Sequence, residues 1–240
     1  MRPIAISLIL VAGCGRLGFD GTTGGAGGGG AGSGGSGLPN NPNDPGTLNS
    51  GLVAQISFDG SLTDDVSSGD AECSGAECPT FAPGVGGEAA VFDGAATCVH
   101  LPWLTSWTPS TYTIAAWVNP TSMSAPIVVR EHDTSCPSPS LESSDSAVGF
   151  VGTTAASTHQ MAWTNTSMLS TGDWTHVAIA FDGTNQRVYV GGTCQCQVQP
   201  AIALAYTTYE VTIGCYPAAG TWYTGAISDV RIYDRVLDSA

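Results

Sequence analysis

The sequence predicts an all-β fold in which two antiparallel sheets pack face to face as a sandwich. Polar and apolar residues alternate along short stretches, most clearly from residue 228 to 233, where Val230 and Ile232 share one face. A period of two is typical of a strand with one buried side. Asp-Gly pairs and other turn residues separate the stretches, and none of them has the periodicity of a helix. Many short strands joined by frequent turns indicate a sandwich.

The predicted elements follow one another through the last 190 or so residues. In chain order, strands are expected at residues 52–58, 87–94, 111–120, 127–130, 147–151, 160–165, 173–183, 186–192, 209–213 and 225–237. Pro120 ends its strand because proline lacks the backbone donor of the ladder. Residues 131–146 are polar and rich in Pro and Ser, which predicts a loop. Ile227 is out of phase with Val230, so either both faces are partly buried there or a bulge resets the register.

The charge balance excludes two classes of partner. The 240-residue chain has six basic residues, all arginine, against twenty acidic ones, which gives a formal net charge of -14. Such a surface repels nucleic acid and anionic membranes. No stretch approaches the roughly 20 apolar residues of a membrane-spanning helix.

The first residues are similar to a bacterial lipoprotein signal peptide. Met1-Arg2 forms a short basic segment, residues 4–12 are apolar, and Val11-Ala12-Gly13-Cys14 matches the motif in which a cysteine is lipidated before cleavage. The apolar segment is too short to span a bilayer. Residues 1–13 are therefore predicted to be a signal peptide and Cys14 the lipid anchor. Gly15 stands where an aspartate would favour the inner membrane, so we expect an outer-membrane lipoprotein that faces the periplasm or the cell surface.

Residues 14–50 are expected to form a flexible linker. Residues 21–37 are almost entirely Gly with Ala, Ser and Thr, and residues 38–45 add Pro and Asn. This composition cannot bury enough apolar surface to offset the entropy of ordering. One domain is then predicted over residues 51–240.

Several blocks of this domain resemble laminin G-like domains of the concanavalin A-like lectin/glucanase superfamily. These are the opening strand with its Phe-Asp-Gly turn, Gly-Glu-Ala-Ala-Val-Phe-Asp-Gly at 87–94, the Trp-Thr-His-Val-Ala block within 173–183, and Asp-Val-Arg-Ile-Tyr within 225–237. The last block departs from the family pattern at Ser228 and Asp234, which replace an Asp and an Asn. The resemblance implies a jelly-roll sandwich.

The cysteines are predicted to form disulfides, because the predicted signal peptide indicates an exported protein. Apart from Cys14, seven cysteines remain. Cys73 and Cys78 are close enough in sequence to form a small local bridge. Cys194 and Cys196 are separated by one residue, so each is expected to pair elsewhere. The odd number leaves one thiol that is free or bonded to another molecule.

The sequence argues against an enzyme. Glycoside hydrolases of this fold carry a Glu-x-Asp-x-x-Glu strand, because their chemistry needs two carboxylates at a fixed separation. The chain has no such strand, no Gly-x-Ser-x-Gly and no His-Glu-x-x-His. Its nearest acidic cluster, Glu131-His132-Asp133, lies in the predicted loop.

The resemblance implies a calcium site at loop ends. Ca²⁺ takes six to eight oxygen ligands, which acidic turns can supply. By position in the matching blocks, Asp93 and Asp229 are the expected ligands, with Asp64 or Asp65 as a weaker addition. The alternative for Asp93 is turn chemistry alone, because Asp-Gly favours tight turns without a metal.

Aromatic side chains near predicted loops are candidates for stacking on a sugar ring. Trp103, Trp107, Trp222 and Tyr223 have this placement, and the alternative for each is a packed loop anchor. Trp117 and Trp174 fall in blocks that predict core packing.

Together these observations predict a non-catalytic binding module that recognises carbohydrate or a glycoprotein, with calcium as a possible cofactor. The alternative is a structural or assembly lipoprotein that contacts other envelope proteins without sugar specificity. The fold does not decide between them, because it hosts lectins, hydrolases and adhesion domains.

Overall fold

The computed structural model describes residues 48–237, with gaps at 68, 131–138, 154–158, 166, 199–203, 205 and 207. The predicted signal peptide, the lipidated Cys14 and the linker lie outside these residues. In the described part of the chain, no helix is long and apolar enough to cross a membrane.

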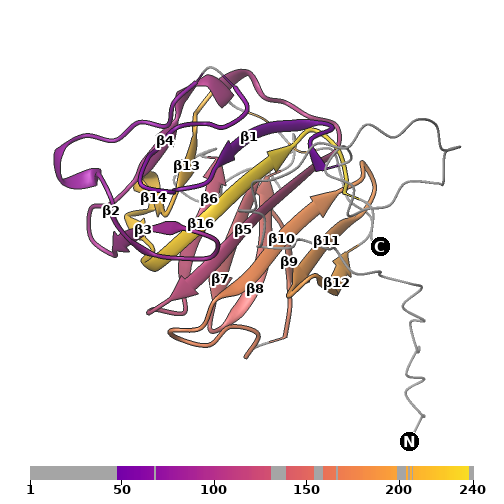
Figure 1. The fold of residues 1–240 in the computed structure, drawn as a ribbon. Coiled ribbons are helices and arrows are strands. Elements are labelled where there is room, and N and C mark those ends of the chain that lie inside the picture. Colours follow the sequence, from indigo (N-terminus) through magenta and orange to yellow (C-terminus); the bar gives the residue numbers. More distant parts are fainter. Residues whose placement is uncertain are drawn as a thin grey trace, which may run out of the picture.

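Eight strands form the larger sheet, called sheet A here (Figure 1). Their order is β12-β11-β10-β5-β16-β3-β2, and β1 also pairs with β16. The strands of sheet A are β1 (Leu52–Ile56), β2 (Thr80–Pro83), β3 (Glu88–Asp93), β5 (Tyr112–Pro120), β10 (Thr175–Phe181), β11 (Gln186–Val190), β12 (Thr193–Val198) and β16 (Thr224–Tyr233). All pairs are antiparallel.

Six strands form the second sheet, called sheet B, in the order β4-β13-β6-β7-β8-β9. They are β4 (Val99–Leu101), β6 (Ala125–Arg130), β7 (Ser140–Ser144), β8 (Ala147–Thr153), β9 (His159–Trp163) and β13 (Val211–Ile213). A small hairpin joins β14 (Cys215–Tyr216) to β15 (Thr221–Trp222), and three short 3-10 helices are present: η1 (Gly75–Glu77), η2 (Pro102–Ser106) and η3 (Pro217–Ala219). The prediction of an all-β, antiparallel two-sheet sandwich is confirmed.

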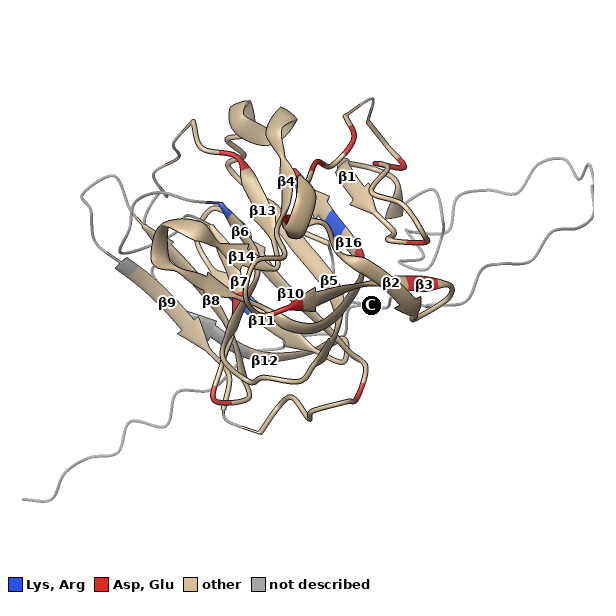
Figure 2. Ribbon diagram, turned by 90° about the vertical axis from the view of Figure 1, so that its left-hand side faces the viewer, with Lys and Arg blue, Asp and Glu red and all other residues tan. Residues whose placement is uncertain are grey.

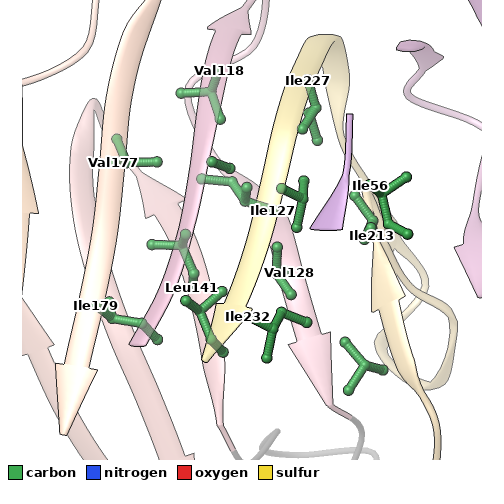
Figure 3. Close-up of a cluster of buried hydrophobic side chains, with 14 of the residues drawn as sticks. Ile56, Val118, Ile127, Val128, Leu141, Val177, Ile179, Ile213, Ile227 and Ile232 are labelled. Atoms are coloured by element: carbon green, nitrogen blue, oxygen red, sulfur yellow. The ribbon is translucent and has the colours of Figure 1, made fainter. Parts of the chain in front are cut away.

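The core lies between the sheets and follows from the alternation along the strands. In β5, Ile114, Ala116 and Val118 point inward and are fully buried. Figure 3 shows the residues that meet there from both sheets: Ile56, Val118, Val177, Ile179, Ile227 and Ile232 of sheet A with Ile127, Val128, Leu141 and Ile213 of sheet B. Each buried side chain of this size contributes roughly 1.5–3 kcal/mol of transfer free energy.

A bulge in β16 resolves the phase problem at Ile227. The pairing of β16 with β5 shifts between Ser228 and Arg231, and Asp229 has a φ of 47° within that shift. The extra residue lets both Ile227 and Val230 enter the core. Of the two alternatives from the sequence, the bulge is confirmed.

One predicted loop is wrong in part. Residues 140–144 lie within the predicted loop of 131–146 but form strand β7, which pairs with β6 and β8. The apolar signal is weak because Leu141 is the one large apolar side chain that β7 sends into the core. The hydroxyl groups of Ser140 and Ser143 are buried and hydrogen-bond to backbone carbonyls, so polar residues complete a strand that the sequence pattern does not reveal.

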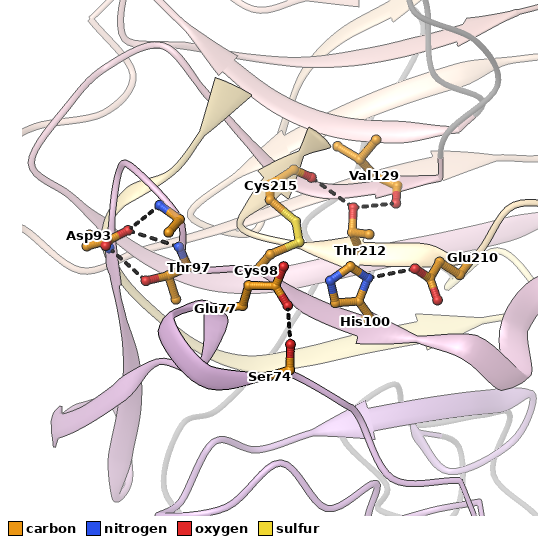
Figure 4. Close-up of a disulfide and its surroundings, with 11 residues drawn as sticks. Ser74, Glu77, Asp93, Thr97, Cys98, His100, Val129, Glu210, Thr212 and Cys215 are labelled. Carbon is orange, nitrogen blue, oxygen red and sulfur yellow. Dashed lines mark hydrogen bonds and ion pairs between the residues drawn. A yellow bond between two sulfur atoms is a disulfide. The ribbon is translucent and has the colours of Figure 1, made fainter. Parts of the chain in front are cut away.

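Two disulfides are described. Cys73 pairs with Cys78, as the spacing predicts, and Cys98 pairs with Cys215 across 117 residues. Figure 4 shows the second bridge between the start of β4 and β14, beside the Thr212 hydroxyl. Cys194 is also disulfide-bonded.

Candidate functional site

Asp93, the first predicted calcium ligand, closes a turn after β3. Its Oδ1 accepts hydrogen bonds from the backbone N–H groups of Ala95 (2.9 Å), Ala96 (3.0 Å) and Thr97 (3.0 Å), as Figure 4 shows in part. These bonds, led by that of Ala96, hold the pKa of Asp93 far below its ordinary value. The local structure is therefore the turn that the alternative interpretation predicts.

The other predicted ligands lie elsewhere. Asp93 is opposite Thr224 in the β3–β16 pair, and Asp229 is five residues further along β16, which places it about 16 Å away at the rise of a strand. Asp229 binds Arg231 Nε (2.9 Å) and Gln55 Nε2 (2.9 Å). Ligands of one Ca²⁺ lie within about 2.6 Å of the ion, so Asp93 and Asp229 cannot share it.

The Asp64 carboxylate is also occupied by hydrogen bonds within the domain. Its Oδ1 accepts the backbone N–H groups of Gln55 (2.9 Å) and Val66 (3.0 Å), and its Oδ2 accepts the Ser67 hydroxyl. Among the described residues, no group of three or more His, Cys, Asp or Glu could hold a metal. The predicted ligand set therefore does not fit one calcium ion.

The Asp93 turn makes a testable contribution to acid stability. Because the folded pKa is depressed, the stabilisation is complete above the unfolded pKa of about 3.9 and is lost as the pH falls towards the folded value. Asp93→Ala should lower the melting temperature at about pH 7 and reduce its further fall on acidification, measured by circular dichroism. Asp93→Asn keeps an acceptor oxygen but loses the charge, so its melting temperature at about pH 7 should lie between those of the wild type and Asp93→Ala. Equal melting curves for Asp93→Ala and the wild type, both at about pH 7 and after acidification below the unfolded pKa, would contradict this role.

The structure corrects the prediction that Trp107 and Tyr223 contact a ligand. Tyr223 is 0% exposed and its ring meets Phe92 edge to face at 6.0 Å. Trp107 is 8% exposed and packs on Tyr112. Buried rings cannot stack on a sugar, so both residues are anchors of the core.

Trp103 and Trp222 are half-buried. Trp103 packs against the main core, and its buried indole nitrogen has no hydrogen-bond partner among the described residues. Trp222 pairs with Cys215 in the small hairpin. Trp117, predicted in the core, instead lies half-buried on the outer face of sheet A against His176, because its neighbours Ala116 and Val118 occupy the inward positions.

A different aromatic, Trp163, lies on the outer face of sheet B. In β9 the inward residue is Ala162, so Trp163 and Met161 point outward, and Met161 is 55% exposed. A Cβ placed on Gly149 would lie 2.2, 2.4 and 2.5 Å from three consecutive atoms of the Trp163 ring. Near-equal distances to adjacent ring atoms mean that the ring turns its face, not its edge, to Gly149. The missing side chain of Gly149 is what lets the indole lie flat on β8.

Glu142 completes this row across the sheet. It pairs with Gly149, which in turn pairs with Trp163, and all three lie on the outer face because Leu141, Phe150 and Ala162 face the core. The Ser140 hydroxyl shares its one proton between two acceptors, Glu142 Oε1 at 2.6 Å and the Val151 carbonyl at 3.2 Å. Burial raises the pKa of Glu142, and the hydrogen bond from Ser140 lowers it by less. We call Trp163, Gly149 and Glu142 the Trp163 row.

Sequence reasoning missed the Trp163 row for a physical reason. The sequence pattern places Glu142 in a loop, and it places Trp163 inside a strand instead of in a loop, where an exposed ring would be sought. The available signal was the alternation Met-Ala-Trp at 161–163, which places Trp163 opposite the inward Ala162.

The matching family covers residues 93–240 and is described as the concanavalin A-like lectin/glucanases superfamily. The chain belongs to this superfamily. The Trp163 row therefore lies within the part of the chain that matches the lectin/glucanase superfamily, on sheet B of its sandwich. No curated protein matches the chain significantly.

Solved structures share the lectin/glucanase fold. Domain 4 of AbnA, an extracellular arabinanase from Geobacillus stearothermophilus in complex with arabinotriose, is 18% identical with a TM-score of 0.57, over 76% of this chain and 91% of that domain. The binding domain of Paraclostridial Mosquitocidal Protein 1 is 11% identical with a TM-score of 0.65, over 79% of this chain and 50% of that one. A botulinum neurotoxin type C structure, which concerns cell entry that depends on two ganglioside molecules, is 12% identical with a TM-score of 0.61, over 80% of this chain and 50% of that one. The chain thus spans about half of the two toxin structures.

Proposed function

We propose that the protein is a non-catalytic carbohydrate-binding module, held at the outer membrane by a lipid on Cys14 and presented on a flexible linker. The observation that carries the proposal is the Trp163 ring laid flat over Gly149 with a carboxylate in the same row. The predicted lipid and linker supply the anchoring, and the sandwich supplies the binding surface.

The Trp163 row has the two parts that sugar recognition needs. A pyranose presents apolar C–H groups on its face and hydroxyl groups at its edge. The half-buried indole offers a flat apolar surface for the first. The Glu142 carboxylate can accept hydrogen bonds from the second, since it uses one of its lone pairs for Ser140.

Glycosidases need two carboxyl groups about 5–9.5 Å apart. Neither described cross-strand neighbour of Glu142, Pro126 or Gly149, supplies a second one. The related structures in complex with arabinotriose, or described with gangliosides, add support for a carbohydrate ligand.

A glycan array with the purified protein tests the proposal. Trp163→Ala should weaken binding at least tenfold, because it removes the stacking surface. Trp117→Ala is the matched control, since it removes a half-buried indole from the outer face of sheet A, and should leave binding unchanged. Equal binding by wild type and Trp163→Ala would reject the Trp163 row as the site. Silence of the wild type on all glycans would favour the structural or assembly alternative.

The array should also be run with Ca²⁺ and with a chelator. Because the predicted calcium ligands do not meet at one point, we expect the same binding in both conditions. Loss of binding with the chelator would mean that a metal-dependent site exists outside the described residues or with other ligands.

A further inference from the structure

We propose that the Trp163 row selects glycans with free amino groups, such as glucosamine oligomers, over their acetylated or uncharged counterparts. The inference rests on the proposed function and names the ligand class of that site. It is carried by the position of one carboxylate beside one aromatic face and by the distribution of charge around them.

Glu142 is a carboxylate with little compensation from the protein. It is half-buried in the middle of β7, with Pro126 and Gly149 as cross-strand neighbours. Among the described residues, the Ser140 hydroxyl is its one hydrogen-bond donor. Burial of a negative charge is costly unless a donor or a cation offsets it, and burial correspondingly raises the pKa of Glu142. A ligand ammonium group would supply both a donor and a positive charge.

Trp163 adds a second element that favours a cation. The electron-rich face of an indole attracts ammonium groups more strongly than the faces of other aromatic side chains do. Its ring lies over Gly149, the residue between Trp163 and Glu142 in the row. An amine resting on the outward face of this ring would therefore contact the indole and lie beside the strand that carries the Glu142 carboxylate.

The described arginines are engaged elsewhere. Arg187 pairs with Asp182 at 2.8 Å and Arg231 pairs with Asp229 at 2.9 Å, both in sheet A or its turns. Arg235 donates to the Ser50 carbonyl at 2.6 Å, beyond the end of β16. Arg130 is buried and its guanidinium donates to the carbonyls of Thr105 and Trp107.

The net negative charge of the chain also favours a cationic ligand. Figure 2 shows acidic segments at several places around the ribbon and only a few short basic ones. The net charge of -14 attracts cationic glycans and repels anionic ones such as uronic acid or sulfated polymers.

Titration calorimetry with short oligomers tests this inference. The wild-type protein should bind a glucosamine tetramer at least tenfold more tightly than the N-acetylglucosamine tetramer or a glucose tetramer, at a pH where the amines are protonated. Glu142→Gln keeps an acceptor for Ser140 and removes the charge, so it should reduce the preference to within about threefold. Asp145→Asn is the matched control, because Asp145 is an exposed acid in the turn after β7 and its loss changes the net charge equally.

The outcomes are separable. Equal affinity of the wild type for the three tetramers would overturn the inference and leave carbohydrate binding in place. An equal loss of preference in Glu142→Gln and Asp145→Asn would also overturn it, because general attraction would then explain the selectivity. Absence of binding to every tetramer and to the array would reject the proposed function itself. Selectivity that falls only in Glu142→Gln supports the inference, and the wild-type comparison decides it even if that variant is unstable.

Discussion

Removing the Cys98–Cys215 disulfide, by replacing both cysteines with alanine, is expected to lower the free energy of unfolding by about 4–5 kcal/mol. The bridge joins residues 117 apart in sequence, and the loss of loop entropy in the unfolded chain grows with the length of the closed loop. Both cysteines are buried, and the Cys98 N–H donates to the Glu77 carbonyl at 2.9 Å. Urea denaturation of the double variant measures the change.

The Cys73–Cys78 bridge is the internal control. It closes a loop with a sequence separation of five, and the same relation predicts a loss of about 2 kcal/mol for its removal. Equal losses for the two double variants would contradict the loop-length explanation.

Gly149→Ala is expected to weaken glycan binding at least tenfold while the melting temperature changes little. The new Cβ would lie 2.2 Å from the Trp163 ring, so the indole must swing away from β8 and lose the orientation that stacks on a sugar. The stability should change little because Trp163 is at the sheet surface and outside the main core. Calorimetry with the best glycan of the array, together with a thermal melt, checks both statements.

A double-mutant cycle with Trp163→Ala separates orientation from other effects. If Gly149→Ala acts by displacing the ring, the double variant should bind no more weakly than Trp163→Ala alone. Additive losses would mean that Gly149 contributes to binding independently of Trp163. Trp163→Phe, which keeps a flat ring, should bind between the wild type and the alanine variant.

The two-sheet sandwich could be predicted from the sequence because its strands show a clear alternation of apolar and polar residues. The alternation of Ile114, Ala116 and Val118 and the phase break at Ile227 both have direct structural counterparts. The failure at β7 has an equally physical origin. Its serines are buried through hydrogen bonds to backbone carbonyls, and a hydrophobicity pattern cannot register that kind of burial.

The candidate site was harder to predict because it depends on neighbours from three strands. Glu142, Gly149 and Trp163 are separated by seven and fourteen residues, and only the register of β7, β8 and β9 aligns them. Two residues predicted as ligand contacts from their position in loops or family blocks have structural roles instead. Asp93 forms a turn with three backbone groups, and Tyr223 is an interior ring.

The pairing of β1 with β16 determines how the domain responds to tension. β1 begins at Leu52 opposite Tyr233 and is attached to sheet A through β16 alone. A pull on the chain before residue 48 therefore acts first on the hydrogen bonds that the Ser50 and Gly51 carbonyls accept from Arg235 and Asp234, and then opens this ladder from Leu52. Trp163 lies in sheet B, at the far side of the core from that ladder. Under the proposed function, tension between the lipid anchor and a bound ligand would thus open β1 before it disturbs the Trp163 row.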